Sequence, residues 1–347
     1  MRHTPANDLD YLAARLHARR TRIAEGGRLE ELCGYDKLLK LTRAVFPGAE
    51  TATTADFQRR LVQQLAEEIH DCLPHLDGAN HQFVEWLLTR LQIEDAKVLL
   101  RGILNHTAAE RLRLHLVPLP DGWALAEAEL LAAKTADEFA ARLPEGSSRR
   151  RLQAILAGPH AAVSGFLLEA ALDAGYFQEL LARLDRIGSS ERELLRPLVL
   201  QEVNLFRFLL AARGRFHFGL NTEAVPALRI AGAVAHWLKA VQSAPDVLSA
   251  ARLAVGRVID SLPLPGEESA LNVPMVETAG WQRYLRLANR AFRCSHNGLA
   301  AVAGYLGMRR IEIANLTAVS EGIRLGAGKG ERREHLLPPL HLEVANV

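Results

Sequence analysis

The residues of this chain that are best suited to hold a metal ion lie in one short segment, HDCLPHLDGANH at 70–81. Its candidate ligands are His70, Cys72, His75 and His81. Imidazole and thiolate are ligands that zinc prefers, but the segment lacks the tight paired spacing of a convincing zinc site. A helix end broken at Pro74 and Gly78 explains the histidines better, because imidazole near a helix C-terminus suits the helix dipole. We therefore expect no metal, with a metal-dependent hydrolase around His70 as the alternative.

A glycine-rich stretch, GIRLGAGKG at 322–330, invites comparison with a phosphate-binding loop. Its spacing differs, because Ile323 stands where the first glycine belongs and Gly330 stands where Ser or Thr must bind magnesium. The preceding pattern is helical, so we interpret the stretch as a glycine-rich helix end beside Lys329. No HExxH, GxSxG or GxGxxG motif occurs in a context that would carry its chemistry. We expect no catalytic centre, no cofactor and no direct nucleotide binding.

Two arginine clusters could bind an anionic partner. They are Arg15, Arg19, Arg20 and Arg22, and Arg149, Arg150 and Arg151. Neither cluster is interleaved with the aromatic residues that would stack on bases, and 42 Lys and Arg against 40 Asp and Glu leave a formal charge of only +2. We expect no nucleic-acid binding. Solvated surface is the preferred interpretation of both clusters, and an acidic protein partner is the alternative.

The composition is that of a globular protein with 347 residues, 49% hydrophobic and 24% charged, which is long enough for two or three domains. The three cysteines are far apart and favour a reducing cytoplasm over a disulfide framework. The N-terminus MRHTPANDLD has no apolar region of a secretory signal, and the longest apolar run, 230–238, is too short to span a bilayer. We expect a cytoplasmic chain.

The elements that must position any site are helices. Long Leu- and Ala-rich segments carry apolar residues three and four apart, and alternating strand patterns are nearly absent, which predicts an all-α fold. In the first segment Asn7 or Asp8 could cap a helix that runs to about Ala24. The buried stripe expected for that helix consists of Leu9, Leu12, Leu16 and Ile23.

Proline and glycine mark the expected boundaries. The stretches VPLPDGW at 117–123 and GLNTEAVPAL at 219–228 divide the chain into domains at 1–118, 119–225 and 226–347. Two further stretches, GSSRRR at 146–151 and PLPGEE at 263–268, are expected to be loops inside these domains.

Each domain contains one copy of a recurring pattern. The copies are LQIEDAKVLLRGIL at 91–104, VNLFRFLLAARGRF at 203–216 and IEIANLTAVSEGIR at 311–324. Ungapped superposition aligns Gly102, Gly214 and Gly322, which we interpret as a shared helix terminus. The period is too long for a solenoid and indicates three similar helical domains. Three such lobes can close around an axis.

The last position of a polar strip is charged in every copy, as Arg101, Arg213 and Glu321. Polar residues also recur at Gln92, Asn204 and Glu312 and at Asp95, Arg207 and Asn315. One interpretation is that the first polar set begins a helix and that the charged strip is solvated. The other is that three equivalent strips line a shared polar cavity or rim.

Three segments carry a resemblance to a known family. DYLAARLHARRTRI at 10–23 resembles the N-terminal helix of the C-type subunit of the archaeal and bacterial V/A-type ATPases, which corresponds to the d-type subunit of eukaryotic V-ATPases. RLQIEDAKVLLRGILNHT at 90–107 resembles the family's first-domain signature, and RIEIANLTAVSEGIRLG at 310–326 matches most closely. In that last segment the family pattern is held by Glu312, Asn315, Leu316, Glu321 and Gly322. The resemblance departs at Asp95 and Arg207, where the family has Asn.

The resemblance implies a non-catalytic component with three helical lobes in a pseudo-threefold, funnel-shaped arrangement. It implies that the chain couples the central stalk, of D-type and F-type subunits, to the membrane rotor ring. In that role it would lie on the cytoplasmic face, link ATP hydrolysis or synthesis to proton or sodium transport, and hold Arg101, Arg213 and Glu321 towards the stalk or ring. A free-standing helical adaptor with another partner is the alternative, because a fold does not fix a function.

Overall fold

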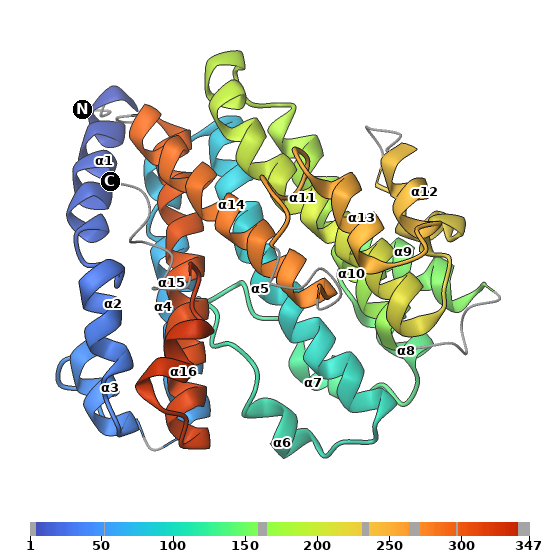
Figure 1. Ribbon diagram of the computed structural model, residues 1–347, viewed down its shortest axis with the longest axis horizontal. Coiled ribbons are helices and arrows are strands. Elements are labelled where there is room, and N and C mark those ends of the chain that lie inside the picture. The colour runs from blue at the N-terminus through green and yellow to red at the C-terminus, as the bar shows by residue number, and fades with distance from the viewer. Residues whose placement is uncertain are drawn as a thin grey trace. The chain divides into compact units, whose positions relative to one another are not determined.

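The computed structural model describes residues 5–51, 53–158, 165–230, 236–263, 271–295 and 298–338, and these residues form helices joined by loops, with no strand among them (Figure 1). The helices up to residue 142 are α1 Pro5–Arg20, α2 Gly26–Cys33, α3 Leu38–Val45, α4 Thr54–His70, η1 Leu73–His75, α5 Gly78–Leu104, α6 Ala109–Arg113, α7 Glu127–Leu131 and α8 Ala136–Arg142. The others are α9 Ser147–Leu156, α10 Gly165–Leu184, α11 Ser189–Phe218, η2 Thr222–Ala224, η3 Pro226–Leu228, α12 His236–Gln242, α13 Val247–Ala254, α14 Val273–Cys294, α15 Leu299–Leu325 and α16 Lys329–Glu334. The predicted all-α fold is confirmed in these residues.

The chain forms two compact units. Unit 1 consists of Met1–Asp77, Val117–Pro120 and Leu285–Val347, and unit 2 consists of Gly78–Leu116 and Asp121–Tyr284. Unit 1 therefore combines the first and last parts of the chain. The division into domains at 1–118, 119–225 and 226–347 stays a prediction.

Unit 1 is built around α15, which packs against α1, α3, α4 and α16. Figure 1 shows α15 running alongside α4, with the N-terminal helices beside them. Most of α15 from Leu299 to Ser320 is buried. Gly304 permits its close approach to α14, because a Cβ atom there would lie only 2.6 Å from the Ala288 carbonyl oxygen and the Phe292 nitrogen.

The first helix ends four residues earlier than expected, at Arg20. The following turn is held by a distant carboxylate, since the Ala24 N–H donates to Glu312 Oε1 at 2.6 Å. Ala24 and Glu312, which belongs to α15, are 288 residues apart in the sequence. This hydrogen bond uses the Ala24 N–H that a longer α1 would need for its own helical bond. The same helix begins at Pro5, before Asn7 and Asp8, so neither residue is its cap.

Unit 2 is organised around α10 and α11. α10 packs against α5, α9 and α11, while α11 also contacts α12 and α13. One apolar cluster joins α11, α12, α13 and the start of α14 through Phe208, Val241, Ala251 and Val276, all of them fully buried. Trp86 of α5 stacks on Tyr176 of α10 and donates its indole N–H to the Tyr176 carbonyl at 3.1 Å. These contacts fix α5 against α10.

The three copies of the repeated pattern occupy the C-terminal halves of the longest described helices. These helices, α5, α11 and α15, contain 27, 30 and 27 residues. Their glycines, Gly102, Gly214 and Gly322, lie within the last turn or just before it. Each glycine carbonyl accepts a hydrogen bond of 2.8 Å from a residue beyond its helix, namely Thr107, Leu220 and Ala327 respectively. The chain reverses in a related way after all three helices.

The same three glycines make room for the returning chain. A Cβ atom at Gly102, Gly214 or Gly322 would clash with Leu112, Thr222 or Arg332 respectively. Those side chains belong to α6, η2 and α16, the short helices that follow each long helix. The glycines are therefore sites of close packing at the helix ends.

The structure tests the predictions for two stretches, a loop at 146–151 and a helix end at 322–330. The predicted loop at 146–151 is wrong beyond Gly146, because α9 begins at Ser147 and α10 covers it. The stretch at 322–330 is a helix end, as predicted: α15 stops at Leu325, and Gly326 adopts the left-handed conformation with φ of +73°. The predicted loop at 263–268 lies outside the described residues after Pro263.

Candidate functional site: a charged groove in unit 2

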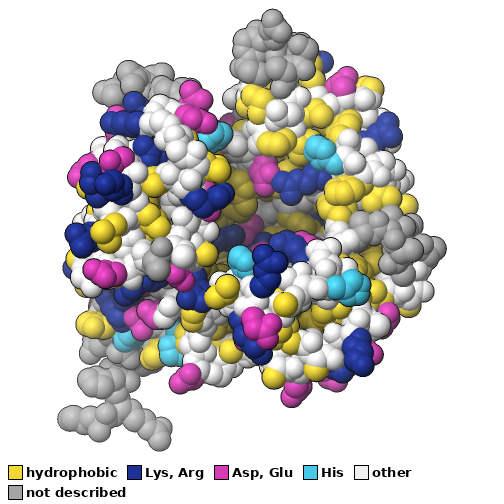
Figure 2. All heavy atoms as spheres, turned by 90° about the horizontal axis from the view of Figure 1, so that it is seen from below, with side chains coloured by type: hydrophobic (Ala, Val, Ile, Leu, Met, Phe, Trp, Pro, Cys, Tyr) yellow, Lys and Arg dark blue, Asp and Glu magenta, His cyan; other side chains and the backbone are white. Residues whose placement is uncertain are grey.

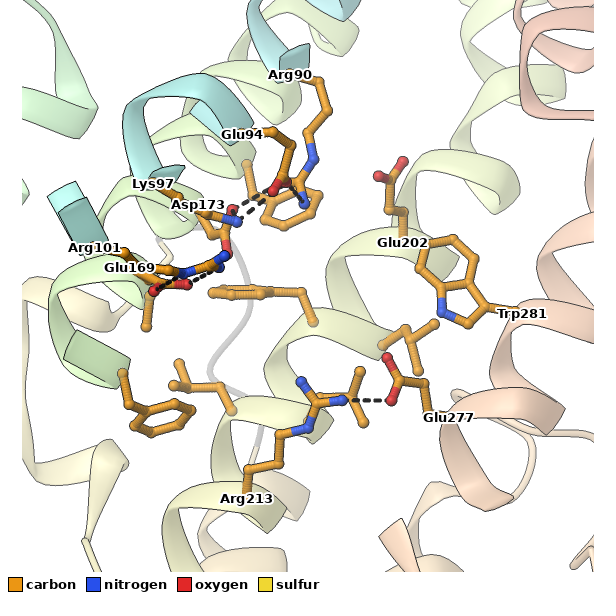
Figure 3. A pocket seen from close by; sticks show the side chains of 17 residues that line it. Arg90, Glu94, Lys97, Arg101, Glu169, Asp173, Glu202, Arg213, Glu277 and Trp281 are labelled. Atoms are coloured by element: carbon orange, nitrogen blue, oxygen red, sulfur yellow. Dashed lines mark hydrogen bonds and ion pairs between the residues drawn. The ribbon is translucent and has the colours of Figure 1, made fainter. Parts of the chain in front are cut away.

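A groove of about 340 Å³ opens in unit 2 between α5, α10, α11 and the first half of α14 (Figure 3). Its floor is apolar and aromatic, and its walls are charged. The floor residues are Phe166, Ala170, Phe177, Leu205, Phe206, Leu209 and Leu210. The charged lining residues are Arg90, Glu94, Lys97, Arg101, Glu169, Asp173, Glu202, Arg213 and Glu277.

The wall between α5 and α10 is a linked set of ion pairs. Arg90 and Lys97 both reach Asp173 Oδ1, at 2.7 and 2.6 Å, and Arg90 also pairs with Glu94 at 2.6 Å. Lys97 is only 5% exposed, so its charge depends on these carboxylates. Arg90 additionally lies over the rings of Tyr176 and Phe177, 5.5 and 5.6 Å from their centroids. These contacts tie α5 to α10 along this wall.

Glu94 is held in its charged form by this wall. Burial acts to raise the pKa of its carboxyl, but the positive charges of Arg90 and Lys97 outweigh that effect and leave the pKa below the ordinary value. Figure 3 shows Glu94 between these two cations. Glu94 is therefore ionised at neutral pH.

Arg101 is the outermost member of the α5 strip. Its Nε and Nη2 donate to the two carboxylate oxygens of Glu169 at 2.5 and 2.6 Å. That bidentate hydrogen bonding raises the pKa of Arg101. Its side chain stays 54% exposed, so this pair lies at the edge of the groove and can be reached from solvent.

The opposite wall comes from α11 and α14. Arg213 of α11 pairs with Glu277 of α14, and Trp281 lies one turn further along α14. Glu202, which is 6% exposed, faces the groove from α11 in Figure 3. Four cations and five anions line the groove, so its formal charge is +4 − 5 = −1. The lining residues that the structure describes include no Ser, Cys or His. Their charged and apolar side chains are suited to binding a partner through ion pairs and apolar contacts.

The structure brings two of the three predicted rim residues into this groove. Arg101 and Arg213 both line it, whereas Glu321 belongs to unit 1. Glu321 accepts from Arg324 Nε at 2.6 Å and from Gln58 Nε2 at 2.7 Å, and these two contacts lower the pKa of its carboxyl. All three rim residues have a charged partner within their own unit, so none is a simply solvated charge.

The other residues of the predicted signature have contacts inside unit 1. Glu312 accepts from the Ala24 N–H and pairs with Arg309. Asn315 makes two bonds to the backbone of Leu337: its Nδ2 donates to the carbonyl at 2.9 Å, and its Oδ1 accepts from the N–H at 2.8 Å. Both residues hold neighbouring chain segments in place.

Arg207, which departs from the family pattern, occupies the position of Asn315 in the second copy. It makes one of the two kinds of backbone hydrogen bond that Asn315 makes. Its Nη2 donates to the Ile230 carbonyl at 2.5 Å. Ile230 follows Arg207 by 23 residues, and Leu337 follows Asn315 by 22. Arg207 therefore bonds to the backbone of the returning chain at nearly the same distance along the sequence, although it cannot accept a bond as Asn315 does.

The candidate zinc ligands do not form a metal site in the part of the chain that the structure describes, where no three His, Cys, Asp or Glu side chains are grouped to hold an ion. Cys72 is fully buried and its Sγ donates to the Glu68 carbonyl at 3.2 Å. Burial raises the pKa of this thiol to about 12, which disfavours the thiolate that zinc requires. His75 packs on Tyr11 instead, with ring centroids 5.4 Å apart.

The two arginine clusters are only partly solvated. Arg15 and Arg19 both donate to Asp71 Oδ2, at 2.6 and 2.9 Å. Arg151 donates to the carbonyls of Ala227 and Arg229, which fixes the end of η3 against α9. The predicted solvated surface therefore holds only in part for Arg15, Arg19 and Arg151, because their guanidinium groups also bond to other parts of the chain. Elsewhere, basic and acidic side chains are interspersed on the face shown in Figure 2, in keeping with the small net charge.

Sequence reasoning missed the partners that complete the groove. Glu169 and Asp173 of α10 are the only charged residues in the otherwise apolar run GFLLEAALDAGYF, and their spacing places both on one face of the helix. That isolated acidic pair was the available signal. Glu277 and Trp281 share the same spacing on α14, but nothing in their own neighbourhood singles them out.

In the described part of the chain, no helix is long and apolar enough to cross a membrane. A family model described as ATP synthase (C/AC39) subunit matches residues 12–334. The C subunit of the V-type ATP synthase of Deinococcus radiodurans is 23% identical over 331 residues, which cover 91% of this chain and 87% of that protein. The match to the family model includes all three copies of the repeated pattern and every residue of the groove.

Proposed function

This chain belongs to the ATP synthase (C/AC39) subunit family, and we propose that it is the non-catalytic central-rotor subunit of a V-type ATPase or ATP synthase. In this role it is a socket between the central stalk, of D-type and F-type subunits, and the membrane rotor ring. Rotation passes through it, so that ATP hydrolysis or synthesis in other subunits is linked to proton or sodium transport. It acts on the cytoplasmic face of the membrane as a peripheral component.

The observation that carries this proposal is the groove of unit 2. Its aromatic floor can receive the apolar side of a stalk tip, while the charged walls select the orientation of that tip. Arg101 and Arg213 stand on different helices of this groove, each with a carboxylate partner. A charged partner can form ion pairs with Arg101 and Arg213 in place of Glu169 and Glu277. Such pairs would fix the position of the partner along the groove without a deep binding site.

The helix construction also suits the transmission of torque. Close-packed interiors deform little under load, and α5, α11 and α15 are long helices with many buried residues along their length. Their matching ends, with a packed glycine and a returning short helix, support the proposal of three similar lobes. We propose that these lobes form the funnel implied by the family, with Arg101, Arg213 and Glu321 towards the bound stalk or ring.

Binding of the stalk by the isolated chain tests the proposal. The purified full-length chain should capture D-type and F-type stalk subunits of the same organism and co-purify with the rotor ring. Capture of neither component under conditions where the rest of the complex assembles would contradict the proposed role. A free-standing adaptor would instead co-purify with proteins outside the rotary complex.

A further inference from the structure

Unit 1 contains a second polar cavity, separate in residues from the groove of unit 2. Its volume is about 660 Å³. It lies between the turn after α1, the helices α2, α3 and α4, and the middle of α15. Five arginines and four carboxylates line it, so the formal charge of its lining is +5 − 4 = +1.

The floor of this cavity is electrically balanced by its own ion pairs. Arg309 donates to Glu68 Oε2 at 3.0 Å and also pairs with Glu312, and the Tyr305 hydroxyl donates to Glu68 at 2.9 Å. At one side, Arg15 and Arg19 share Asp71. Arg15 is not itself a lining residue, but when it is counted with Arg19 and Arg309 against Glu68, Asp71 and Glu312, three cations and three carboxylates cancel, +3 − 3 = 0.

The mouth of the cavity, unlike its floor, carries a net positive charge. Its remaining charged lining residues are Arg22, Arg28, Arg60 and Glu67. Within the described residues, none of these arginines has a carboxylate within ion-pairing distance. Arg28 donates one Nη1 bond to the Arg22 carbonyl at 2.5 Å, and the Arg60 guanidinium lies over the Phe46 ring, 5.2 Å from its centroid. The mouth carries +3 − 1 = +2.

We infer that this cavity binds a phosphate-bearing anion at its arginine mouth. Guanidinium groups bind phosphate through two parallel N–H bonds, and three of them have donors left over here. The net +2 of the mouth matches the charge of about −1.5 to −2 on a phosphate monoester at neutral pH. A volume of about 660 Å³ is also in the range of small-molecule sites, roughly 300–1,000 Å³. This inference does not depend on the proposed role of the groove.

The phosphate can come from a free small molecule or from a lipid headgroup, and one experiment separates these sources. Calorimetric titration of the full-length chain with sodium pyrophosphate measures the free anion. Sedimentation with vesicles of phosphatidylcholine, with and without phosphatidic acid, measures a headgroup that ends in a phosphate monoester. Binding of pyrophosphate alone assigns a free ligand, and binding to anionic vesicles that pyrophosphate displaces assigns a headgroup.

Matched variants test whether the arginine mouth is responsible. The variant Arg22→Gln, Arg28→Gln, Arg60→Gln should bind at least about tenfold more weakly. The control variant Arg150→Gln, Arg186→Gln, Arg293→Gln loses the same charge from exposed positions outside the cavity and should stay within about twofold of wild type. All six side chains are exposed, so both variants should fold. Equal losses in the two variants, no binding of either phosphate source, or binding only of an acidic peptide such as polyglutamate would overturn the inference.

Discussion

Arg101 and Glu169 form a two-bond ion pair at the edge of the unit 2 groove, with Nε–Oε1 and Nη2–Oε2 distances of 2.5 and 2.6 Å. Because the Arg101 side chain is 54% exposed, this pair stabilises the fold by no more than about 1 kcal/mol. Its geometry is well defined, but its loss costs little stability. A partner can therefore compete for either group without disturbing the helices beneath.

Reversing the three rim charges should separate binding from folding. In the variant Arg101→Glu, Arg213→Glu, Glu321→Arg, we expect stalk binding to weaken by at least about tenfold, because like charges then face the bound partner. The melting temperature should change little. A suitable control is Arg150→Glu, Arg293→Glu, Glu145→Arg, which makes the same changes at exposed positions elsewhere. Unchanged stalk affinity in the rim variant would rule out these residues as contacts.

The lowered pKa of Glu94 predicts a dependence of stability on pH. A carboxyl whose folded pKa lies below its ordinary value of about 4.3 stabilises the fold above that value. This contribution is lost as the pH falls through the lowered folded pKa. The stability difference between wild type and Glu94→Gln, from urea unfolding, should therefore shrink as the pH is lowered from about 6 to 3. A difference that stays constant over this range would refute the paired state of Glu94.

The packing at the repeated glycines predicts an unusual response to alanine. A methyl group at Gly322 would clash with the middle of the Arg332 side chain, which is buried and donates to the Tyr35 carbonyl. We expect Gly322→Ala to destabilise unit 1 by about 1–3 kcal/mol despite its better helix propensity. Gly330→Ala is the matched control, since it lies in α16 with no atom near the added methyl group. Equal stability of both variants by thermal unfolding would show that the close approach is unimportant.

The buried ion pairs of Arg309 predict a large effect of removing one charge. Glu312 and Glu68 raise the pKa of Arg309 against the opposing effect of its burial, so the residue stays charged. Arg309→Met leaves both carboxylates buried without their cation and should cost about 3–5 kcal/mol. Arg113→Met breaks the pair with Glu127, in which Arg113 is half exposed, and should cost about 1 kcal/mol or less. Comparable losses in the two variants would contradict the buried network.

The long helices and their ends could be predicted from the sequence because the signals are local. Apolar residues three and four apart predicted α5, α11 and α15, and the aligned glycines located their termini. The GSSRRR stretch was misjudged for an equally physical reason. Polar residues normally favour a loop, but Ser148 donates to the Leu172 carbonyl of α10 at 3.0 Å, so tertiary packing stabilises α9.

The candidate site could be predicted only in part, because its pairs join distant helices. Arg101 and Arg213 were identifiable from the repeat, whereas Glu169 and Glu277 lie 68 and 64 residues away from them. The role of Arg207 was hidden for the same reason. The long Arg207 side chain and the short Asn315 side chain each donate to a backbone carbonyl of the returning chain. The two residue types alone do not show that they make equivalent bonds.

The coupling of ATP hydrolysis to ion transport tests the proposed function most directly. The measurement is the number of ions transported per ATP hydrolysed by the rotary complex in sealed vesicles, assembled with and without this chain. Without the chain, hydrolysis should continue while ATP-driven transport is lost, and adding the chain back should restore transport. Full coupling in its absence would contradict the proposed role as the socket between stalk and ring.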